Sequence, residues 1–264
     1  MSDSISSSRA DRLATPVTES KITLRFATLE PRLIPPLDVG GFTPLSTTDW
    51  PGQLAAVVFV QGCPWRCHYC HNPALQPRQS GCGRDTLAWG RVLDTLKQRQ
   101  GLLDGVVFSG GEPTLDAALE SAMREVRELG FQVGLHTAGL YPQRLANVLP
   151  LLDWVALDIK TEFEDYKAIT SVPRSGEPVR ESLDMVLSSG KAHELRTTWH
   201  PELIADATLM RMARMLKSVG AQRWVLQGYR ATPVTEAALG AGERTPPHEL
   251  VARLRQIGPV LSVR

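Results

Sequence analysis

The sequence predicts an α/β protein built on a parallel β-sheet. Three observations lead to this prediction. Short apolar runs rich in β-branched residues recur along the chain, each is followed by a segment with helical spacing of its apolar residues, and the alternation repeats about six times. Such strands pair in parallel, because each helix carries the chain back across the sheet. Six units are too few for an eight-stranded barrel, so we expect an open or partial barrel, or a doubly wound sheet.

The expected strands are short runs of Ala, Val, Leu and Phe bounded by Gly or polar residues. Runs of this kind are typical of strands buried on both faces of a parallel sheet. The expected strands are residues 55–62, 105–109, 132–137, 154–160, 194–199 and 223–227, followed by a last strand at 260–263.

Between these runs the apolar residues recur at three- and four-residue intervals, which indicates helices with one buried face. Asp85 is expected to cap the first helix, and Asp206 or Thr208 the fifth. The expected helices are residues 86–98, 114–129, 142–149, 178–188, 206–219 and 247–256.

The first 37 residues differ from the rest of the chain. Residues 1–20 are polar and serine-rich, and the segment ends at Pro35 and Pro36. Too few apolar residues are present there to form a core. We therefore expect a flexible N-terminal extension at 1–37 and a single domain at 38–264.

The composition excludes several classes of partner. The 264 residues include 29 Lys or Arg and 28 Asp or Glu, a net charge of +1, so bulk charge does not indicate nucleic-acid binding. No apolar run approaches the ~20 residues that span a bilayer. The N-terminus lacks the apolar stretch of a secretory signal. A cytoplasmic protein without a membrane partner is expected.

Three of the four cysteines, Cys63, Cys67 and Cys70, lie within eight residues directly after the first strand. Close clustering of this kind indicates metal binding in a reducing compartment rather than disulfide bonds. Thiolates select iron–sulfur clusters, zinc or copper(I). A [4Fe–4S] cluster held by three thiolates has one iron without a protein ligand, and that iron is open to a substrate.

A structural zinc site is the alternative to an iron–sulfur cluster. Such a site normally has four protein ligands. Its fourth ligand would have to be His68, His71 or the more distant Cys82. Cys82 lies between two glycines in an expected loop and is interpreted mainly as a bystander.

Polar or glycine-rich segments follow the later strands, at the carboxyl ends where α/β proteins place their function. Each also has a structural explanation: a turn, a packed neutral histidine, a surface ion pair, or a pair between Arg196 and Glu194. The segments are Ser-Gly-Gly-Glu-Pro at 109–113, His-Thr-Ala-Gly at 136–139, Asp-Ile-Lys at 158–160 and Glu-Leu-Arg-Thr-Thr at 194–198.

Residues 63–70 resemble the C-x3-C-x-aromatic-C signature of radical S-adenosylmethionine (SAM) enzymes, and the resemblance continues through the strand ends over residues 38 to 230. It implies a partial (β/α)6 barrel of the radical SAM type. It also implies a [4Fe–4S] cluster on the three clustered cysteines, with SAM bound at the open iron. The SAM contacts implied by the resemblance are Tyr69, Gly110, Gly111, Glu112, Thr137, Asp158, Lys160, Arg196 and His200, with Gln227 as a weaker candidate.

The segment at 136–139 resembles the Asp-Thr-Asn-Gly of glycyl radical activating enzymes, with two departures. His136 replaces the aspartate and Ala138 replaces the asparagine. In some relatives that aspartate helps to bind a monovalent cation near SAM. The departure puts a cation at this position of the chain in question.

Residues 39–52 carry a Ser-Thr-x-Asp-x-Pro-Gly motif, which could also be only a turn before the first strand. With the segments around Cys63 and Cys70, it resembles the longer activating proteins of anaerobic ribonucleoside-triphosphate reductase. The resemblance implies that reductive cleavage of SAM gives a 5′-deoxyadenosyl radical, which takes a hydrogen from a glycine of that reductase. A flavodoxin- or ferredoxin-type electron donor is implied as well.

Three alternatives remain open at this point. The partner could be another glycyl radical enzyme, such as one like pyruvate formate-lyase. The substrate could be a small molecule. In a different class, the protein could be a zinc-binding structural module.

Overall fold

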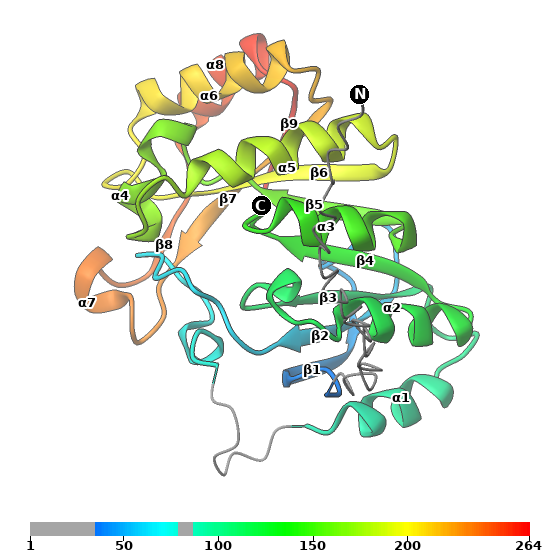
Figure 1. Cartoon of the computed structure of the whole chain (residues 1–264). Coiled ribbons are helices and arrows are strands. Elements are labelled where there is room, and N and C mark those ends of the chain that lie inside the picture. Colours follow the sequence, from blue (N-terminus) through cyan, green and yellow to red (C-terminus); the bar gives the residue numbers. More distant parts are fainter. Residues whose placement is uncertain (1–34, 79–86) are drawn as a thin grey trace, which may run out of the picture. The chain divides into compact units, whose positions relative to one another are not determined.

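The structure is a computed structural model that describes residues 35–78 and 87–264. At its centre, strands β2 to β7 run parallel in sequence order (Figure 1). This order confirms the predicted α/β fold, and within the described ranges the sheet does not close into a barrel. The parallel strands are β2 Ala55–Val60, β3 Gly105–Gly110, β4 Gln132–Thr137, β5 Trp154–Asp158, β6 Ala192–Trp199 and β7 Arg223–Arg230.

The two edges of the sheet carry shorter or irregular strands. Strand β1, Val39–Ser46, pairs antiparallel with β2 and was not predicted. Its two glycines and Pro44 conceal the strand pattern, and a proline is tolerated because β1 is an edge strand with shifts in register. At the other edge, the predicted last strand is β9, Val260–Val263, and the unpredicted β8 is Glu243–Arg244; both pair with β7.

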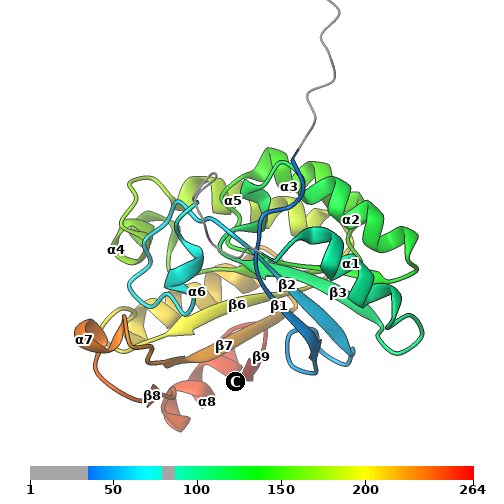
Figure 2. The same ribbon diagram turned by 90° about the horizontal axis from the view of Figure 1, so that it is seen from below.

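The longer helices cover the outer face of the sheet (Figures 1 and 2). Their buried residues recur at helical spacing, as Val179, Leu183 and Val186 do, and they join the main apolar core with one face of the strands. The helices are α1 Trp89–Lys97, α2 Leu119–Glu128, α3 Pro142–Val148, α4 Tyr166–Thr170, α5 Gly176–Ser188, α6 Asp206–Ser218, α7 Glu236–Leu239 and α8 His248–Ile257. The short 3-10 turns are η1 Pro73–Leu75, η2 Pro113–Leu115, η3 Leu149–Leu151 and η4 Phe163–Asp165.

The predicted start of α2 and the predicted cap of α6 were wrong, although α6 begins at Asp206 as expected. Helix α2 begins at Leu119 because Asp116 has an extended backbone, which separates the helix from turn η2. Helix α6 has Ala205 at its N-cap without a side-chain hydrogen bond. Asp206 lies instead in the first turn, where a carboxylate favours the helix dipole. The predicted cap of α1, Asp85, lies outside the described residues.

The inner face of the sheet is closed by an aromatic pair. Trp50, in the loop between β1 and β2, stacks on Trp154 of β5 with ring centroids 5.5 Å apart and planes inclined by 15°. A Cβ on Gly134 would lie 2.9 Å from the Trp50 ring, so the bare glycine of β4 makes room for the indole. A second, smaller apolar cluster therefore forms on this face around Trp50 and Trp154.

The predicted N-terminal extension lies almost wholly outside the described residues. Leu37, its last residue, is buried in the main core. In the part of the chain that the structure describes, no helix is long and apolar enough to cross a membrane.

We predict that Trp50→Ala lowers the free energy of unfolding by about 3 kcal/mol, because it removes a buried indole and leaves a cavity against Trp154. Urea denaturation measures the change. The matched control is Leu102→Ala, which truncates a side chain that is 67% exposed and should change stability by less than about 0.5 kcal/mol. Equal stabilities for the two variants would contradict the proposed closure of the inner face.

Candidate SAM and iron–sulfur site

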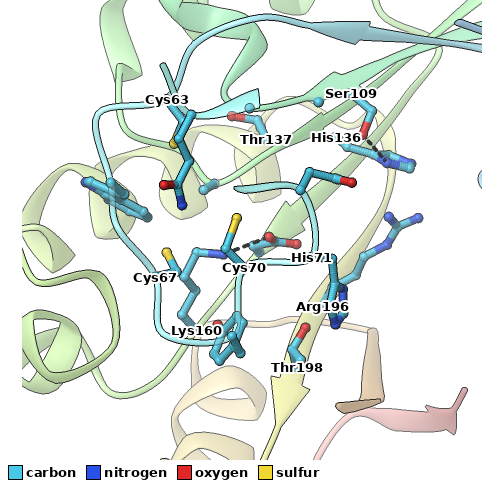
Figure 3. Close-up of a pocket in the computed structure, with 18 of the residues that line it drawn as sticks. Cys63, Cys67, Cys70, His71, Ser109, His136, Thr137, Lys160, Arg196 and Thr198 are labelled. Atoms are coloured by element: carbon cyan, nitrogen blue, oxygen red, sulfur yellow. Dashed lines mark hydrogen bonds and ion pairs between the residues drawn. The ribbon is translucent and has the colours of Figure 1, made fainter. Parts of the chain in front are cut away.

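The carboxyl ends of the parallel strands and the loop after β2 that carries Cys63, Cys67 and Cys70, called the cysteine loop below, enclose one pocket of about 200 Å³ (Figure 3). Figure 3 shows the three cysteines on one side of this pocket, with His136 and Arg196 on the opposite side. Ten of the twelve predicted site residues line it: Cys63, Cys67, Tyr69, Cys70, Gly110, Gly111, Thr137, Asp158, Lys160 and Arg196. The weaker candidate Gln227 lines it too.

The cysteine loop is held by its backbone at both ends. Its two ends are joined where the amides of Gly62 and Cys63 donate to the carbonyls of Leu75 and Gln76, at 2.7 and 3.0 Å. Its middle is anchored on helix α4, because the amides of Arg66 and His68 donate to carbonyls of that helix. The loop is therefore positioned without help from the cysteine side chains, which remain available as ligands.

The next loop packs directly on the cysteine loop. The amide of Glu112 donates to the carbonyl of Gly62 at 2.8 Å. A Cβ on Gly111 would collide with that same carbonyl, so this close approach of two backbones requires glycine. The paired glycines thus bring the end of β3 against the loop that carries the thiols.

The donor set fits a [4Fe–4S] cluster better than a single ion. Within residues 35–78 and 87–264, no three His, Cys, Asp or Glu side chains are grouped closely enough to hold one metal ion. Three thiols of one loop that line one pocket suit a cluster, in which each thiolate binds a different iron. Burial raises the pKa of Cys63 to about 12 and also raises that of Cys67, so binding to a metal is needed to hold these groups as thiolates.

Asp158 and Lys160 form a pair at the end of β5. The Lys160 ammonium lies 2.9 Å from an oxygen of Asp158 and 5.6 Å from the centre of the Tyr69 ring. Burial opposes the charge on Lys160, but the nearby Asp158 carboxylate raises the pKa of the ammonium well above its usual value. Lys160 is buried, whereas the Asp158 side chain is 40% exposed. The carboxylate is therefore accessible from the pocket while the lysine fixes its position.

Glu112 does not line the pocket. Its side chain is fully buried, and its carboxylate accepts hydrogen bonds from Thr114, from the Thr137 hydroxyl at 2.7 Å and from the Ala138 amide at 2.8 Å. Burial raises the pKa of this carboxyl group, and the donated hydrogen bonds oppose the rise. Glu112 therefore joins the loops after β3 and β4 and presents Thr137 to the pocket.

His136 is a neutral, packed histidine. Its Nε2 donates to the Asp49 carbonyl at 2.8 Å, so Nδ1, 3.2 Å from the Ser109 hydroxyl, is the acceptor (Figure 3). Burial, reinforced by the positive charge of Arg196, lowers the pKa of His136 well below its usual value. The His136 ring thus supplies no negative charge to the pocket.

Arg196 lines the pocket and is also held by the protein. Its Nε donates to Glu194 at 2.6 Å and its Nη2 to the Asp49 carbonyl at 3.3 Å. Its guanidinium lies 5.2 Å from the centre of the Trp154 ring. Arg196 therefore forms its ion pair with Glu194 and lines the pocket at the same time.

His200 does not line the pocket. Strand β6 ends at Trp199, and the chain then turns, because the His200 carbonyl accepts from the amides of Leu203 and Ile204. The ring is buried, with Nδ1 accepting from the Glu202 amide and Nε2 3.2 Å from the Leu239 carbonyl. The ring therefore contacts the end of helix α7, and the SAM contact of His200 stays a prediction that this pocket does not support.

The pocket also contains residues that the sequence reasoning did not single out. Ser109 and Thr198 each lie two residues from a predicted site residue, Gly111 and Arg196 respectively. Because alternate residues of a strand share a face, this spacing could have identified them. Trp65, Asn72 and Gln76 come from the cysteine loop and its exit, where no periodic pattern places side chains.

Residues 57–213 match the family described as the Radical SAM superfamily, which is more than half of the chain. The protein therefore belongs to the radical SAM superfamily. Members of this family use a [4Fe–4S] cluster and SAM, so these are its cofactors. Membership in this family also favours an iron–sulfur cluster over the structural zinc site that the cysteine spacing left open.

More specific relatives are found by sequence. A Methanocaldococcus jannaschii protein with the provisional name of glycyl-radical enzyme activating enzyme is 32% identical over 187 residues, which are 68% of this chain and 75% of that protein. The pyruvate formate-lyase-activating enzyme of Clostridium pasteurianum is 35% identical over 138 residues, 50% of this chain and 56% of that enzyme.

Solved structures support the fold. A radical SAM methyltransferase from Sphaerobacter thermophilus matches 81% of this chain and 67% of its own, with a TM-score of 0.60 and 19% identity. Streptococcus suis SuiB bound to SAM matches 77% of this chain, but only 48% of its own, with a TM-score of 0.57 and 13% identity. At these identities the similarity concerns the fold alone.

We predict that Glu112→Gln lowers the free energy of unfolding by about 2 kcal/mol. In the wild type, one carboxylate oxygen accepts from the backbone N–H of Thr114 and the other from that of Ala138. In either orientation of the glutamine amide, its NH₂ group replaces one of these acceptors and leaves a buried backbone N–H facing another donor. Urea denaturation without SAM measures the loss. Glu120→Gln, at a half-exposed position on α2, is the control and should be nearly neutral. A stability of Glu112→Gln equal to that of the control would contradict the bridging role.

Proposed function

We propose that this protein is an activating enzyme that cleaves SAM and installs a radical on a glycine of a partner enzyme. The observation that carries the proposal is the combination of three cysteines on one anchored loop with a polar pocket at the strand ends. The names of the relatives from Methanocaldococcus jannaschii and Clostridium pasteurianum support the choice of a glycyl radical enzyme as partner.

In this proposal, Cys63, Cys67 and Cys70 hold the cluster and leave one iron for SAM. When bound and reduced by an electron donor, the cluster would supply one electron to SAM, which breaks a C–S bond of the sulfonium and releases methionine and a 5′-deoxyadenosyl radical. The protein's contribution is to orient SAM and to exclude water from the pocket. Tyr69, buried beside Lys160, offers an apolar ring face to the adenine.

The remaining contacts follow from charge and backbone shape. The guanidinium of Arg196 binds the SAM carboxylate, since its fork of N–H groups matches a carboxylate. Gly110 and Gly111 allow SAM to approach the backbone at the end of β3. The half-exposed carboxylate of Asp158, held by Lys160, is the acceptor for an ammonium or hydroxyl group of SAM. Glu112 acts through Thr137, which it positions.

The partner that we propose is anaerobic ribonucleoside-triphosphate reductase, because of the motif at residues 46–52. Contacts of this motif beside the pocket support the proposal: the Asp49 carbonyl accepts from both His136 and Arg196, and Trp50 closes the inner face of the sheet. A flavodoxin- or ferredoxin-type donor and a cytoplasmic location belong to the same proposal.

A second candidate partner is an enzyme like pyruvate formate-lyase. The specific observation in its favour is the similarity to pyruvate formate-lyase-activating enzymes of Clostridium pasteurianum and Streptococcus mutans, the latter 28% identical over 196 residues.

The test of the partner is anaerobic incubation with SAM, a reductant and each candidate reductase or lyase in turn. Electron paramagnetic resonance should detect a glycyl radical on the reductase. A radical on the lyase alone would replace the first partner by the second. Cleavage of SAM without a radical on either protein would contradict both candidates.

We predict that Cys67→Ala loses the cluster and with it more than about 99% of the reductive cleavage of SAM, since two thiolates cannot hold a cubane in place. Iron and sulfide content and 5′-deoxyadenosine formation by anaerobically purified protein measure the loss. Cys82→Ala is the matched cysteine control and should keep both. Stoichiometric zinc without iron in the wild type, or full cleavage by Cys67→Ala, would contradict the proposal.

A further inference from the structure

Beneath the pocket, strand β6 carries a buried group of charges. Glu194 accepts from two arginines: Arg196 Nε donates to its Oε1 at 2.6 Å, and Arg264 donates to both of its oxygens, at 3.1 and 3.0 Å. The Glu194 and Arg196 side chains are only 6% and 8% exposed, and Arg264 is 37% exposed. The proposal for SAM binding uses Arg196 and leaves the other two residues without a role.

Two arginines share one carboxylate in this group, so Arg196 has no carboxylate partner of its own in it. His136, which lies beside Arg196, is neutral, with a pKa that burial lowers first and the charges of Arg196 and Arg264 lower further. Asp49 contacts Arg196 through its backbone carbonyl, while its carboxylate accepts from the Ser46 hydroxyl. A buried arginine that lines a pocket and shares its carboxylate partner with a second arginine favours an anionic ligand in that pocket.

The position of the Arg196 guanidinium is fixed on three sides. Glu194 holds Nε, the Asp49 carbonyl holds Nη2, and the Trp154 ring lies beneath the plane. Trp154 is itself held by its stack with Trp50. The contacts leave both N–H groups of Nη1 and one of Nη2 for a ligand, since the chain's hydrogen bonds to Arg196 in the described residues use only Nε and one N–H of Nη2.

We propose that Arg264 is a positioning residue, which engages the Glu194 carboxylate so that Arg196 remains available to bind the carboxylate group of the ligand in the pocket. The inference rests on the proposed function, in which that ligand is SAM. Arg264 lies 70 positions from Glu194 in the sequence.

The reason is a competition for one carboxylate. With Arg264 present, its paired N–H groups occupy both Glu194 oxygens, and Arg196 receives a single bond through Nε. Without Arg264, Glu194 is free to take two N–H groups of Arg196 in a bidentate pair. That pair is neutral and draws the guanidinium toward the base of the pocket, so the affinity for a carboxylate falls.

The test compares two ligands on the reconstituted holoprotein by anaerobic calorimetry: SAM and decarboxylated SAM, which lacks the carboxylate. Arg264→Ala should weaken SAM binding about tenfold, the size expected when an outer partner of a binding group is removed. Binding of decarboxylated SAM should change less than about twofold. Arg264→Lys keeps the charge but loses the bidentate geometry, so it should recover part of the affinity.

The control is Arg124→Ala, which breaks an Arg–Glu pair on the outer helix α2 and should leave both affinities unchanged. Equal losses for the two ligands in Arg264→Ala would show a general structural effect and overturn the inference, as would no loss for either. The wild-type holoprotein tests the proposed function separately. If it binds neither SAM nor decarboxylated SAM, both the proposed function and the inference about Arg264 are overturned.

Discussion

The site depends on a single buried carboxylate, that of Glu112. It accepts hydrogen bonds from Thr114, Thr137 and Ala138, while its own amide donates to the carbonyl of Gly62. One residue therefore ties together the cysteine loop, the end of β3 and the end of β4. Because a buried carboxylate without donors is costly, these three segments have to stay in register around it.

The two faces of the sheet have different roles: the outer face packs against helices, and the inner face leads to the pocket. The outer face is apolar and is covered by helices, which supplies the main core. The inner face ends in charged and polar side chains toward the pocket, and the stack of Trp50 on Trp154 closes it from below. Arg196 rests on this aromatic pair and faces the pocket. The stacked tryptophans that close the inner face therefore also position the positive charge of Arg196 at the pocket.

Local patterns made most of the fold predictable. The apolar runs placed β4 at residues 132–137 as observed, and the cysteine spacing placed the three thiols on the pocket. Non-local contacts were not predictable, because no pattern connects Trp50 with Trp154 or Arg264 with Glu194. His200 shows a further limit. Alternation along β6 places it with Arg196, but the strand ends one residue earlier and the turn redirects the ring.

We propose that three thiolates hold a [4Fe–4S] cluster whose fourth iron binds SAM. Electron paramagnetic resonance of the anaerobically reduced protein, before and after addition of SAM, tests this directly. We expect the signal of a reduced [4Fe–4S] cluster that changes shape when SAM is added, because SAM becomes a ligand of the open iron. A cluster signal that SAM leaves unchanged, or reduced protein without any cluster signal, would contradict it.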